Sequence, residues 1–227
     1  MSATARLVEL RQNVMKQNDV LARSLRQRFQ AQGIYVVSIV SSPGSGKTAF
    51  LEKTLAMLRD RFRVAALVGD LATENDSERL ARAQVPVKQI TTGTICHLDA
   101  QMVESALADW QPSNLDILFI ENVGNLVCPS SYDLGENLRL ILMSVTEGED
   151  KPLKYPTIFN TADVAIITKM DLAAAAEFDL SLACSNIQAV RPGMQVMKLS
   201  AKTGLEFDDW VDFLKAEREQ LYAGVLQ

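Results

Sequence analysis

The sequence contains very few residues of the types that bind transition metals or form disulfide bonds. Among its 227 residues there are one histidine and three cysteines. Such a small, odd number of cysteines argues against a disulfide framework, so we expect a reduced, cytoplasmic protein. The two rare residue types nevertheless meet, because His97 directly follows Cys96 in TTGTICHLDAQ, residues 91–101.

Long apolar runs and an excess of positive charge are also missing. No stretch approaches the roughly 18 apolar residues that a membrane span requires, and residues 1–14 lack the apolar core of a signal peptide. The net charge is −5, and no run of basic residues offsets it. Because binding to a phosphate backbone needs clustered Lys and Arg, we expect neither a nucleic-acid partner nor a membrane.

Strand-like apolar segments alternate with helical segments along the chain. This alternation implies crossover connections and a mainly parallel sheet of about seven strands with helices on both faces. We expect one α/β domain over residues 1–227 with ligands at the carboxyl ends of its strands. The expected strands are 34–40, 64–69, 87–91, 115–122, 138–146, 162–168 and 195–200, and the expected helices are 4–32, 48–61, 77–83, 98–110, 177–190 and 207–223.

A loop rich in glycine and serine follows the first expected strand. Its sequence, SSPGSGKT (residues 41–48), matches the P-loop pattern G-x-x-x-x-G-K-[ST] except that Ser41 replaces the first glycine. Lys47 should reach the β- and γ-phosphates of a nucleotide, and Thr48 should bind Mg²⁺. The sequence therefore predicts a P-loop NTPase, with nucleotide contacts from Ser42, Pro43, Gly44, Ser45, Gly46, Lys47, Thr48 and Ala49.

Two carboxylates end strands next to this loop. Asp70 ends the second expected strand and Glu121 ends the fourth, so both should lie at the same sheet edge, where Mg²⁺ takes one or two carboxylates. With Lys47 they are our candidate catalytic residues. Gly124 ends an E-x-x-G turn and can sense the γ-phosphate. Asp76 is either a further ligand or the N-cap of a helix.

Two later segments indicate which base is bound. IITKMDL (166–172) resembles the N-K-x-D element of GTPases with Thr168 in place of Asn, and LSAKTG (199–204) resembles their S-A-K element. A carboxylate at Asp171 can accept both donors on the guanine edge, which adenine does not offer. The alternative is that Asp171 only caps the next helix. The expected base contacts are Thr168, Lys169, Asp171, Ser200, Ala201 and Lys202.

Cys96, His97 and Cys128 form a candidate transition-metal site. The loop holding Cys128 follows the Glu121–Gly124 turn, and both loops should leave the same sheet edge. Two thiolates and an imidazole suit Zn²⁺ or Ni²⁺ and leave one position open for water or a second subunit. The alternative is that the cysteines are small core residues, the role we expect for Cys184.

Five segments together resemble the HypB family of hydrogenase-maturation GTPases: SSPGSGKT, GDLATENDSERL, TTGTICHLDAQMV, IENVGNLVCPSSYDLGE and SVTEGEDKPLKYPTIF. The resemblance runs from about residue 15 to the C-terminus. It implies a SIMIBI-class GTPase that helps to deliver nickel to the [NiFe]-hydrogenase large subunit, with Cys96, His97 and Cys128 matching the family's metal motif at a dimer interface. It also implies a homodimer, a HypA-type nickel chaperone and the hydrogenase precursor as partners. The chain departs from the family pattern at Thr168 and lacks an N-terminal cysteine-rich motif and a histidine-rich tract.

The nucleotide-binding and metal-binding segments suggest a mechanism in which nucleotide state is coupled to the metal ligands. GTP with Mg²⁺ would order the segments after Asp70 and Glu121, which lead to the metal ligands. Hydrolysis should be slow, because the switch segments show no obvious catalytic arginine or glutamine. Lys151 and Lys154 either contact nucleotide across a dimer or belong to a solvated loop. Two other functions stay open: a P-loop small-molecule kinase, and a nucleotide-gated dimeric scaffold with a structural zinc.

Overall fold

The computed structural model describes residues 3–70, 79–80, 82–112 and 114–223. Within them, seven strands form one sheet in the order β3-β2-β4-β1-β5-β6-β7, and every neighbouring pair is parallel. The predicted α/β architecture is confirmed. The strands are β1 (Tyr35–Ser41), β2 (Val64–Asp70), β3 (Val87–Thr91), β4 (Ile117–Glu121), β5 (Leu138–Ser144), β6 (Val164–Thr168) and β7 (Gln195–Lys198).

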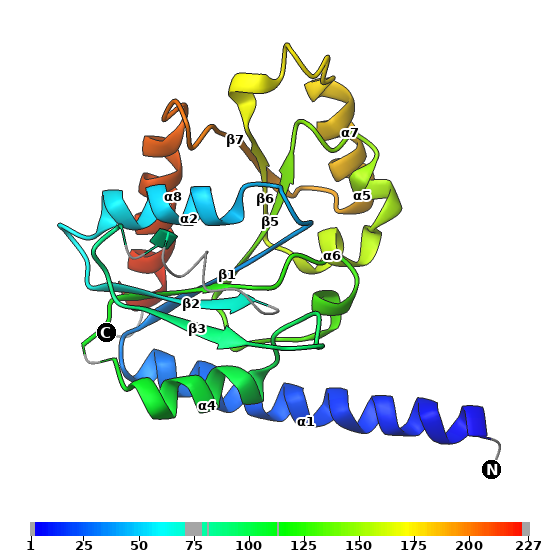
Figure 1. Ribbon diagram of the computed structural model, residues 1–227, viewed down its shortest axis with the longest axis vertical. Helices are drawn as coiled ribbons and strands as arrows, with labels where there is room; N and C mark the ends of the chain where they lie inside the picture. The colour runs from blue at the N-terminus through cyan, green and yellow to red at the C-terminus, as the bar shows by residue number, and fades with distance from the viewer. Residues whose placement is uncertain (1–2, 71–78, 81, 113, 224–227) are drawn as a thin grey trace.

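Helices cover both faces of this sheet (Figure 1). Helices α2 and α8 lie against one face, α1 and α4 lie against the other, and the N-terminal half of α1 extends beyond the sheet. None of the helices in the described chain is long and apolar enough to cross a bilayer. The helices are α1 (Ala3–Ala31), α2 (Lys47–Leu58), α4 (Ala100–Trp110), α5 (Lys151–Lys154), α6 (Pro156–Thr161), α7 (Leu180–Val190) and α8 (Phe207–Ala223), with 3₁₀ turns η1 (Cys128–Ser131) and η2 (Met170–Leu172).

The central strand β1 is buried along its whole length. Its alternate side chains enter different cores: Val37 and Ile39 pack beneath α2 and α8, whereas Val36 packs beneath α1 and α4. Burial on both faces explains why this strand reads as a continuous apolar run in the sequence. It also delivers the following loop, from residue 42, to the middle of the sheet edge.

The structure differs from the expected helices at several places; α7, for example, begins at Leu180 rather than at residue 177. Helices α5 and α6 fill a segment to which the sequence assigned no helix. Pro152 and Pro156 each occupy a first helical turn, where proline is tolerated. Helix α4 begins at Ala100 rather than residue 98, because Asp99 caps it by accepting from the Met102 N–H at 2.8 Å. Asp76 and most of the expected helix 77–83 lie outside the described residues.

Candidate functional site

The loop between β1 and α2 has the geometry of a phosphate-binding loop. Gly44 and Gly46 have φ angles of +75° and +95°, a left-handed backbone that favours glycine. Gly46 directly precedes α2, so the positive end of that helix faces the loop. Lys47, the first residue of α2, is only 8% exposed. The loop thus presents backbone N–H groups and a buried ammonium group to the same space.

Ser41 replaces the first glycine of the pattern without disrupting this loop. It is fully buried at the end of β1, and its hydroxyl donates to the Ser42 carbonyl at 2.7 Å. The same oxygen accepts from the Ser45 hydroxyl and, at 3.0 Å, from the Lys47 ammonium. Ser41 therefore joins both ends of the loop, a role that the P-loop pattern alone did not indicate.

A cavity of about 540 Å³ opens beside the loop. Its wall brings together most of the predicted phosphate and Mg²⁺ residues, although Ser42, Ser45 and Glu121 are not among the residues that line it. It also includes Arg79, which sequence analysis did not assign to the site and which pairs with Glu52 at 2.8 Å. The lining residues are Pro43, Gly44, Gly46, Lys47, Thr48, Ala49, Asp70, Arg79, Val123, Gly124 and Lys169.

Thr48 and Glu121 are in direct contact, which places both of them close enough to share one Mg²⁺ ion. The Thr48 hydroxyl donates to Glu121 Oε1 at 2.8 Å, and the Glu121 side chain is 2% exposed at the end of β4. Asp70 ends the neighbouring strand β2 and lines the same cavity. A hydroxyl and two carboxylates are oxygen donors of the kind that Mg²⁺ prefers, so the residues present fit this ion.

Gly124 lies against the phosphate-binding loop. A Cβ atom at this position would be 3.1 Å from the Pro43 Cα and 3.2 Å from its nitrogen, both backbone atoms that cannot easily move away. Only glycine allows this approach without displacing the loop. The turn after β4 is therefore positioned to respond to what the loop holds.

The expected base contacts line a second cavity of about 230 Å³, next to the first. Asp171 lies at its wall, and its Oδ1 accepts from the Ser200 hydroxyl at 2.5 Å. This bond leaves the second carboxylate oxygen available to a ligand. The full lining is Gly46, Ala49, Phe50, Thr168, Lys169, Asp171, Leu172, Leu199, Ser200, Ala201 and Lys202.

Hydrogen bonds from Thr168 and Lys169 connect the expected base-binding segment to the phosphate loop. The Thr168 hydroxyl lies 2.6 Å from the Ser45 carbonyl oxygen, and the Lys169 ammonium donates to the Gly44 carbonyl at 2.6 Å. Lys169 adopts φ +57°, which turns the chain sharply at the end of β6. The T-K-x-D segment thus holds the phosphate loop in place through hydrogen bonds and is also a candidate base site.

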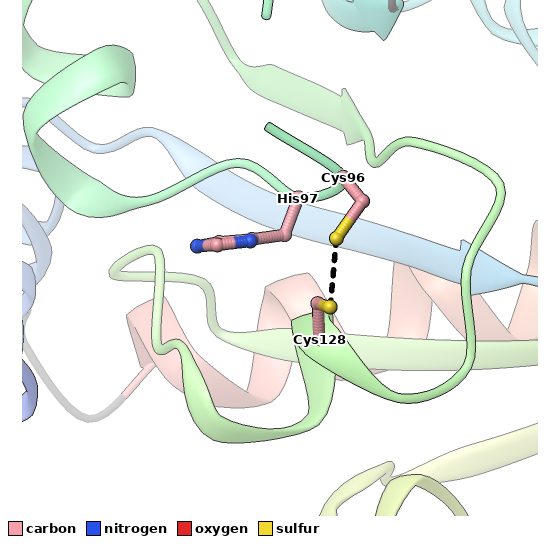
Figure 2. Close-up of side chains that lie close together, drawn as sticks. All are labelled: Cys96, His97 and Cys128. Atoms are coloured by element: carbon pink, nitrogen blue, oxygen red, sulfur yellow. Dashed lines mark hydrogen bonds between the residues drawn. The ribbon is translucent and has the colours of Figure 1, made fainter. Parts of the chain in front are cut away.

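The predicted transition-metal ligands also meet (Figure 2). One ligand atom from each of Cys96, His97 and Cys128 lies within 4.8 Å of the others. The two sulfur atoms are 2.7 Å apart, although these residues are 32 positions apart in sequence. Two thiols and an imidazole in one cluster are a donor set suited to Zn²⁺ or Ni²⁺.

The position of the His97 ring suits the binding of a metal ion. Its ring stacks on Tyr132 with centroids 4.0 Å apart, and its buried Nδ1 has no hydrogen-bond partner among the described residues. Burial lowers the pKa of His97, and nearby Asp99 opposes this shift. The shift favours the neutral imidazole, which is the form that binds metals. Tyr132 was not identified from sequence, because aromatic stacking leaves no local pattern.

Direct hydrogen bonds link the metal loop to the turn after β4. The residue after Glu121, Asn122, accepts from the Leu98 N–H at 3.0 Å through Oδ1. The residue after Gly124, Asn125, donates to the Cys96 carbonyl at 3.3 Å. The Leu98 side chain also lies against Gly69, the residue before Asp70, where an added Cβ would be 2.8 Å away. The two sites therefore share a hydrogen-bonded boundary that sequence patterns did not predict.

Three other residues singled out from the sequence do not belong to the Cys96–His97–Cys128 cluster. Lys154 pairs with Asp150 at 2.6 Å on an exposed surface. Lys151 lies 3.9 Å from a Glu147 carboxylate oxygen, and Glu147 also accepts from the Ser42 hydroxyl of the phosphate loop. Cys184, on α7, is partly buried and packs against the apolar core, in keeping with the role expected for it.

Comparison with known proteins places these features in a family. The model of the CobW/HypB/UreG nucleotide-binding domain matches residues 35–198. The hydrogenase maturation factor HypB of Azotobacter vinelandii is 42% identical over 214 residues, which cover 94% of this chain and 71% of that protein. The chain belongs to the HypB family of hydrogenase maturation factors.

Crystal structures of HypB proteins have the same fold. HypB from Helicobacter pylori, in complex with nickel, has a TM-score of 0.85 and 42% identity, covering 91% of this chain and 97% of that one. HypB from Archaeoglobus fulgidus has a TM-score of 0.83 and 37% identity, covering 89% and 99%. The match to the CobW/HypB/UreG domain model spans the phosphate loop and both metal-ligand loops, whereas Ser200, Ala201 and Lys202 lie just beyond its last matched residue.

Proposed function

We propose that this HypB-family chain is a GTP-hydrolysing nickel metallochaperone. In this proposal nickel reaches the Cys96–His97–Cys128 site from a HypA-type chaperone and leaves it for the hydrogenase large-subunit precursor. Bound nucleotide, and pairing of two copies of the chain, control the affinity of the site. Support comes from the maturation role of the HypB relatives, the nickel complex of one of them, and the donor set described above.

The phosphate cavity supplies the chemistry of GTP hydrolysis. The Lys47 ammonium would neutralise charge that develops on the β- and γ-phosphates. Thr48, Asp70 and Glu121 would hold Mg²⁺, directly or through water, and the ion would add further positive charge beside the same phosphates. The Gly124 N–H would contact the γ-phosphate from the opposite wall of the cavity. GDP would lose this last contact.

Guanine selectivity would rest on Asp171. Its carboxylate can accept two hydrogen bonds from the guanine edge, while Ser200 holds it in position at 2.5 Å. Ala201 and Lys202 would back the base from the wall of the smaller cavity. Adenine would leave the carboxylate without matching donors, and an unsatisfied carboxylate strongly disfavours the wrong ligand.

The observation that carries the regulatory part of the proposal is the pair of bonds from Asn122 and Asn125 to the metal loop. Both asparagines belong to the turn that contains Gly124. A shift of this turn on loss of the γ-phosphate would therefore move the backbone at Cys96 and Leu98. A coupling of about 1.4 kcal/mol would change metal affinity tenfold. Metal binding would alter GTP affinity by the same factor.

A nickel titration tests the proposal. Metal-free protein would be titrated with Ni²⁺ or Zn²⁺ in the presence of GDP or a non-hydrolysable GTP analogue, with subunit mass measured in each state. Cys96→Ala and His97→Ala should abolish tight binding. Cys184→Ala is the matched control, because this cysteine packs in the core away from the ligands, and it should bind as the unmodified chain does.

Each outcome distinguishes one function from another. Nickel affinity that differs between GDP and the analogue, and is lost in the Cys96 and His97 variants, supports a gated delivery site. Equal affinity in both states would instead favour a scaffold with a structural zinc. Failure to bind either metal would refute the metallochaperone. Transfer of labelled γ-phosphate to a metabolite rather than to water would favour a kinase.

A further inference from the structure

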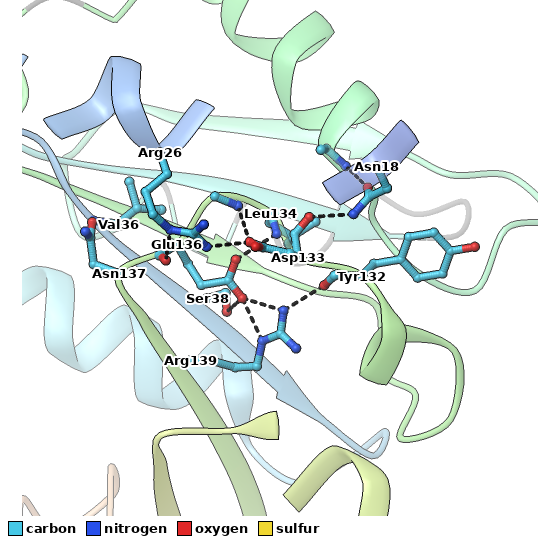
Figure 3. Close-up of polar contacts among 12 residues, drawn as sticks. Asn18, Arg26, Val36, Ser38, Tyr132, Asp133, Leu134, Glu136, Asn137 and Arg139 are labelled. Carbon is cyan, nitrogen blue, oxygen red and sulfur yellow. Dashed lines mark hydrogen bonds and ion pairs between the residues drawn. The ribbon is translucent and has the colours of Figure 1, made fainter. Parts of the chain in front are cut away.

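One buried side chain of helix α1 contacts both segments that carry the metal ligands. Asn18 is 7% exposed. Its Oδ1 accepts from the Ala100 N–H at 2.9 Å, and its Nδ2 donates to the Asp133 carbonyl at 2.9 Å (Figure 3). Ala100 begins α4 just after His97, and Asp133 follows the 3₁₀ turn that begins at Cys128. The Asn18 amide therefore joins the two ligand segments, although Ala100 and Asp133 lie 82 and 115 residues away from it in the sequence.

The turn on the Asp133 side is fixed by further contacts. Arg26, also on α1, pairs with the Asp133 carboxylate at 2.7 Å. Arg139 donates to the Tyr132 carbonyl at 2.7 Å and forms a buried ion pair with Glu136. Figure 3 shows these groups converging beneath α1. The Asn18 bonds therefore connect a turn that is itself held by several contacts to the start of α4.

Tyr132 connects this turn to the metal ligands. Its carbonyl is held by Arg139, and its ring stacks on His97 with centroids 4.0 Å apart. Cys128 begins the 3₁₀ turn that leads directly to Tyr132. Movement of the turn away from α4 would therefore change both the orientation of His97 and its separation from Cys128.

We infer that Asn18 is a positioning residue of the metal site, an inference that rests on the proposed metal-binding function. It sets the separation of the His97 and Cys128 segments, and through it the metal affinity. Asparagine suits this role because its amide supplies one acceptor and two donors. The acceptor satisfies a backbone N–H that the first turn of α4 leaves unpaired. Groups that orient metal ligands in this way typically change metal affinity by about 10- to 100-fold when removed.

Two substitutions of Asn18 distinguish the contributions of its two hydrogen bonds. Asn18→Ala removes both hydrogen bonds. Asn18→Asp keeps an acceptor for Ala100 but places a carboxylate oxygen against the Asp133 carbonyl. Nickel affinity would be measured by competition titration, and Co²⁺ absorption would report ligand geometry. We expect Asn18→Ala to bind nickel about tenfold more weakly, with an altered Co²⁺ spectrum and GDP affinity within about twofold of the original.

Two controls separate positioning from general stability. Asp19→Ala changes the exposed neighbour of Asn18 and should leave metal binding unchanged. Thr54→Val removes the hydroxyl that accepts from Trp210 at 3.1 Å between α2 and α8, on the opposite face of the sheet. It should lower the melting temperature without changing the Co²⁺ spectrum.

The inference is overturned if both Asn18 variants keep the original nickel affinity and Co²⁺ spectrum, or if Thr54→Val alters them equally. If the unmodified chain binds no nickel, the proposed function itself fails. That result is distinct from a failure confined to the Asn18 variants. Should Asn18→Ala not fold, Asn18→Asp, which keeps one of the two bonds, carries the same test.

Discussion

Thr168 holds the phosphate loop at the position where the N-K-x-D pattern has asparagine. Its hydroxyl lies 2.6 Å from the Ser45 carbonyl oxygen and 3.3 Å from that of Met143. A threonine hydroxyl has one proton to donate, whereas an asparagine amide has two. Because that proton is used on the protein backbone, Thr168 holds the loop, and base selection in the proposed function would rest on Asp171.

Thr168→Val should therefore weaken nucleotide binding without changing its base preference. The two side chains have nearly the same shape, so the main loss is one buried hydrogen bond of about 1 kcal/mol. We expect GDP affinity to fall about fivefold in a calorimetric titration, with the preference for GDP over ADP retained. Thr161→Val is the control, because that hydroxyl donates to the Ile158 carbonyl within α6. Unchanged GDP affinity in Thr168→Val would show that the Thr168–Ser45 hydrogen bond does not contribute to nucleotide binding.

At the scale of elements, Asp116 joins three segments at the sheet edge opposite the candidate nucleotide site. It precedes β4, and its carboxylate accepts from the Arg63 side chain at 2.8 and 2.9 Å and from the Arg63 backbone N–H at 2.8 Å. Arg218 of α8 lies 3.4 Å from the same group. The hydrogen bond from the Arg63 side chain is the main cause that lowers the pKa of Asp116.

Asp116→Asn should reduce stability in a pH-dependent manner. A carboxyl group whose pKa is lowered by folding stabilises the protein above its unfolded pKa of about 3.9, and this contribution is lost as the pH falls through the folded pKa. We expect a loss of about 1 kcal/mol at pH 7, since the Arg63 side chain is largely exposed. Urea unfolding at pH 7, 5 and 3.5 should show the difference shrinking at the lowest pH. Asp212→Asn, at an exposed pair with Lys215, is the control. A difference independent of pH would exclude this mechanism.

Elements with a continuous physical signal were predictable from sequence. The buried strands β1, β4 and β6 are apolar on both faces, so their composition alone identified them. Helices α5 and α6 are too short for a periodic pattern, and their leading prolines resemble loop signals. The start of α4 was misplaced by two residues because the capping bond of Asp99 depends on backbone geometry.

At the scale of the whole molecule, the candidate metal site could be predicted only in part from the sequence. Cys96 and His97 are adjacent, and strand order indicated that Cys128 would approach them. Asn18 and Tyr132 carry no such signal, since their roles depend on partners that only the tertiary fold brings close. Sequence patterns thus identified the candidate ligands, whereas the residues that hold them in place required the structure.

Nucleotide binding should stabilise the entire chain. A ligand present at 100 times its dissociation constant adds about 2.7 kcal/mol, which corresponds to roughly 5–10 °C in melting temperature for a protein of this size. We expect GDP with Mg²⁺ to produce such a shift in a thermal-unfolding assay and ADP at the same concentration to produce a much smaller one. Lys47→Ala should remove most of the GDP effect. Equal shifts with GDP and ADP would contradict guanine selectivity.

The single histidine makes the candidate metal site unusually easy to observe by nuclear magnetic resonance. A chain of 227 residues with one imidazole has one set of ring-proton signals, and these need no residue-by-residue assignment. The aromatic face of Tyr132, 4.0 Å away, should move them from the frequencies of free imidazole through its ring current. Diamagnetic zinc would displace the signals, whereas a paramagnetic ion would broaden them. The arrival, exchange and departure of an ion could thus be followed in unlabelled protein through one side chain.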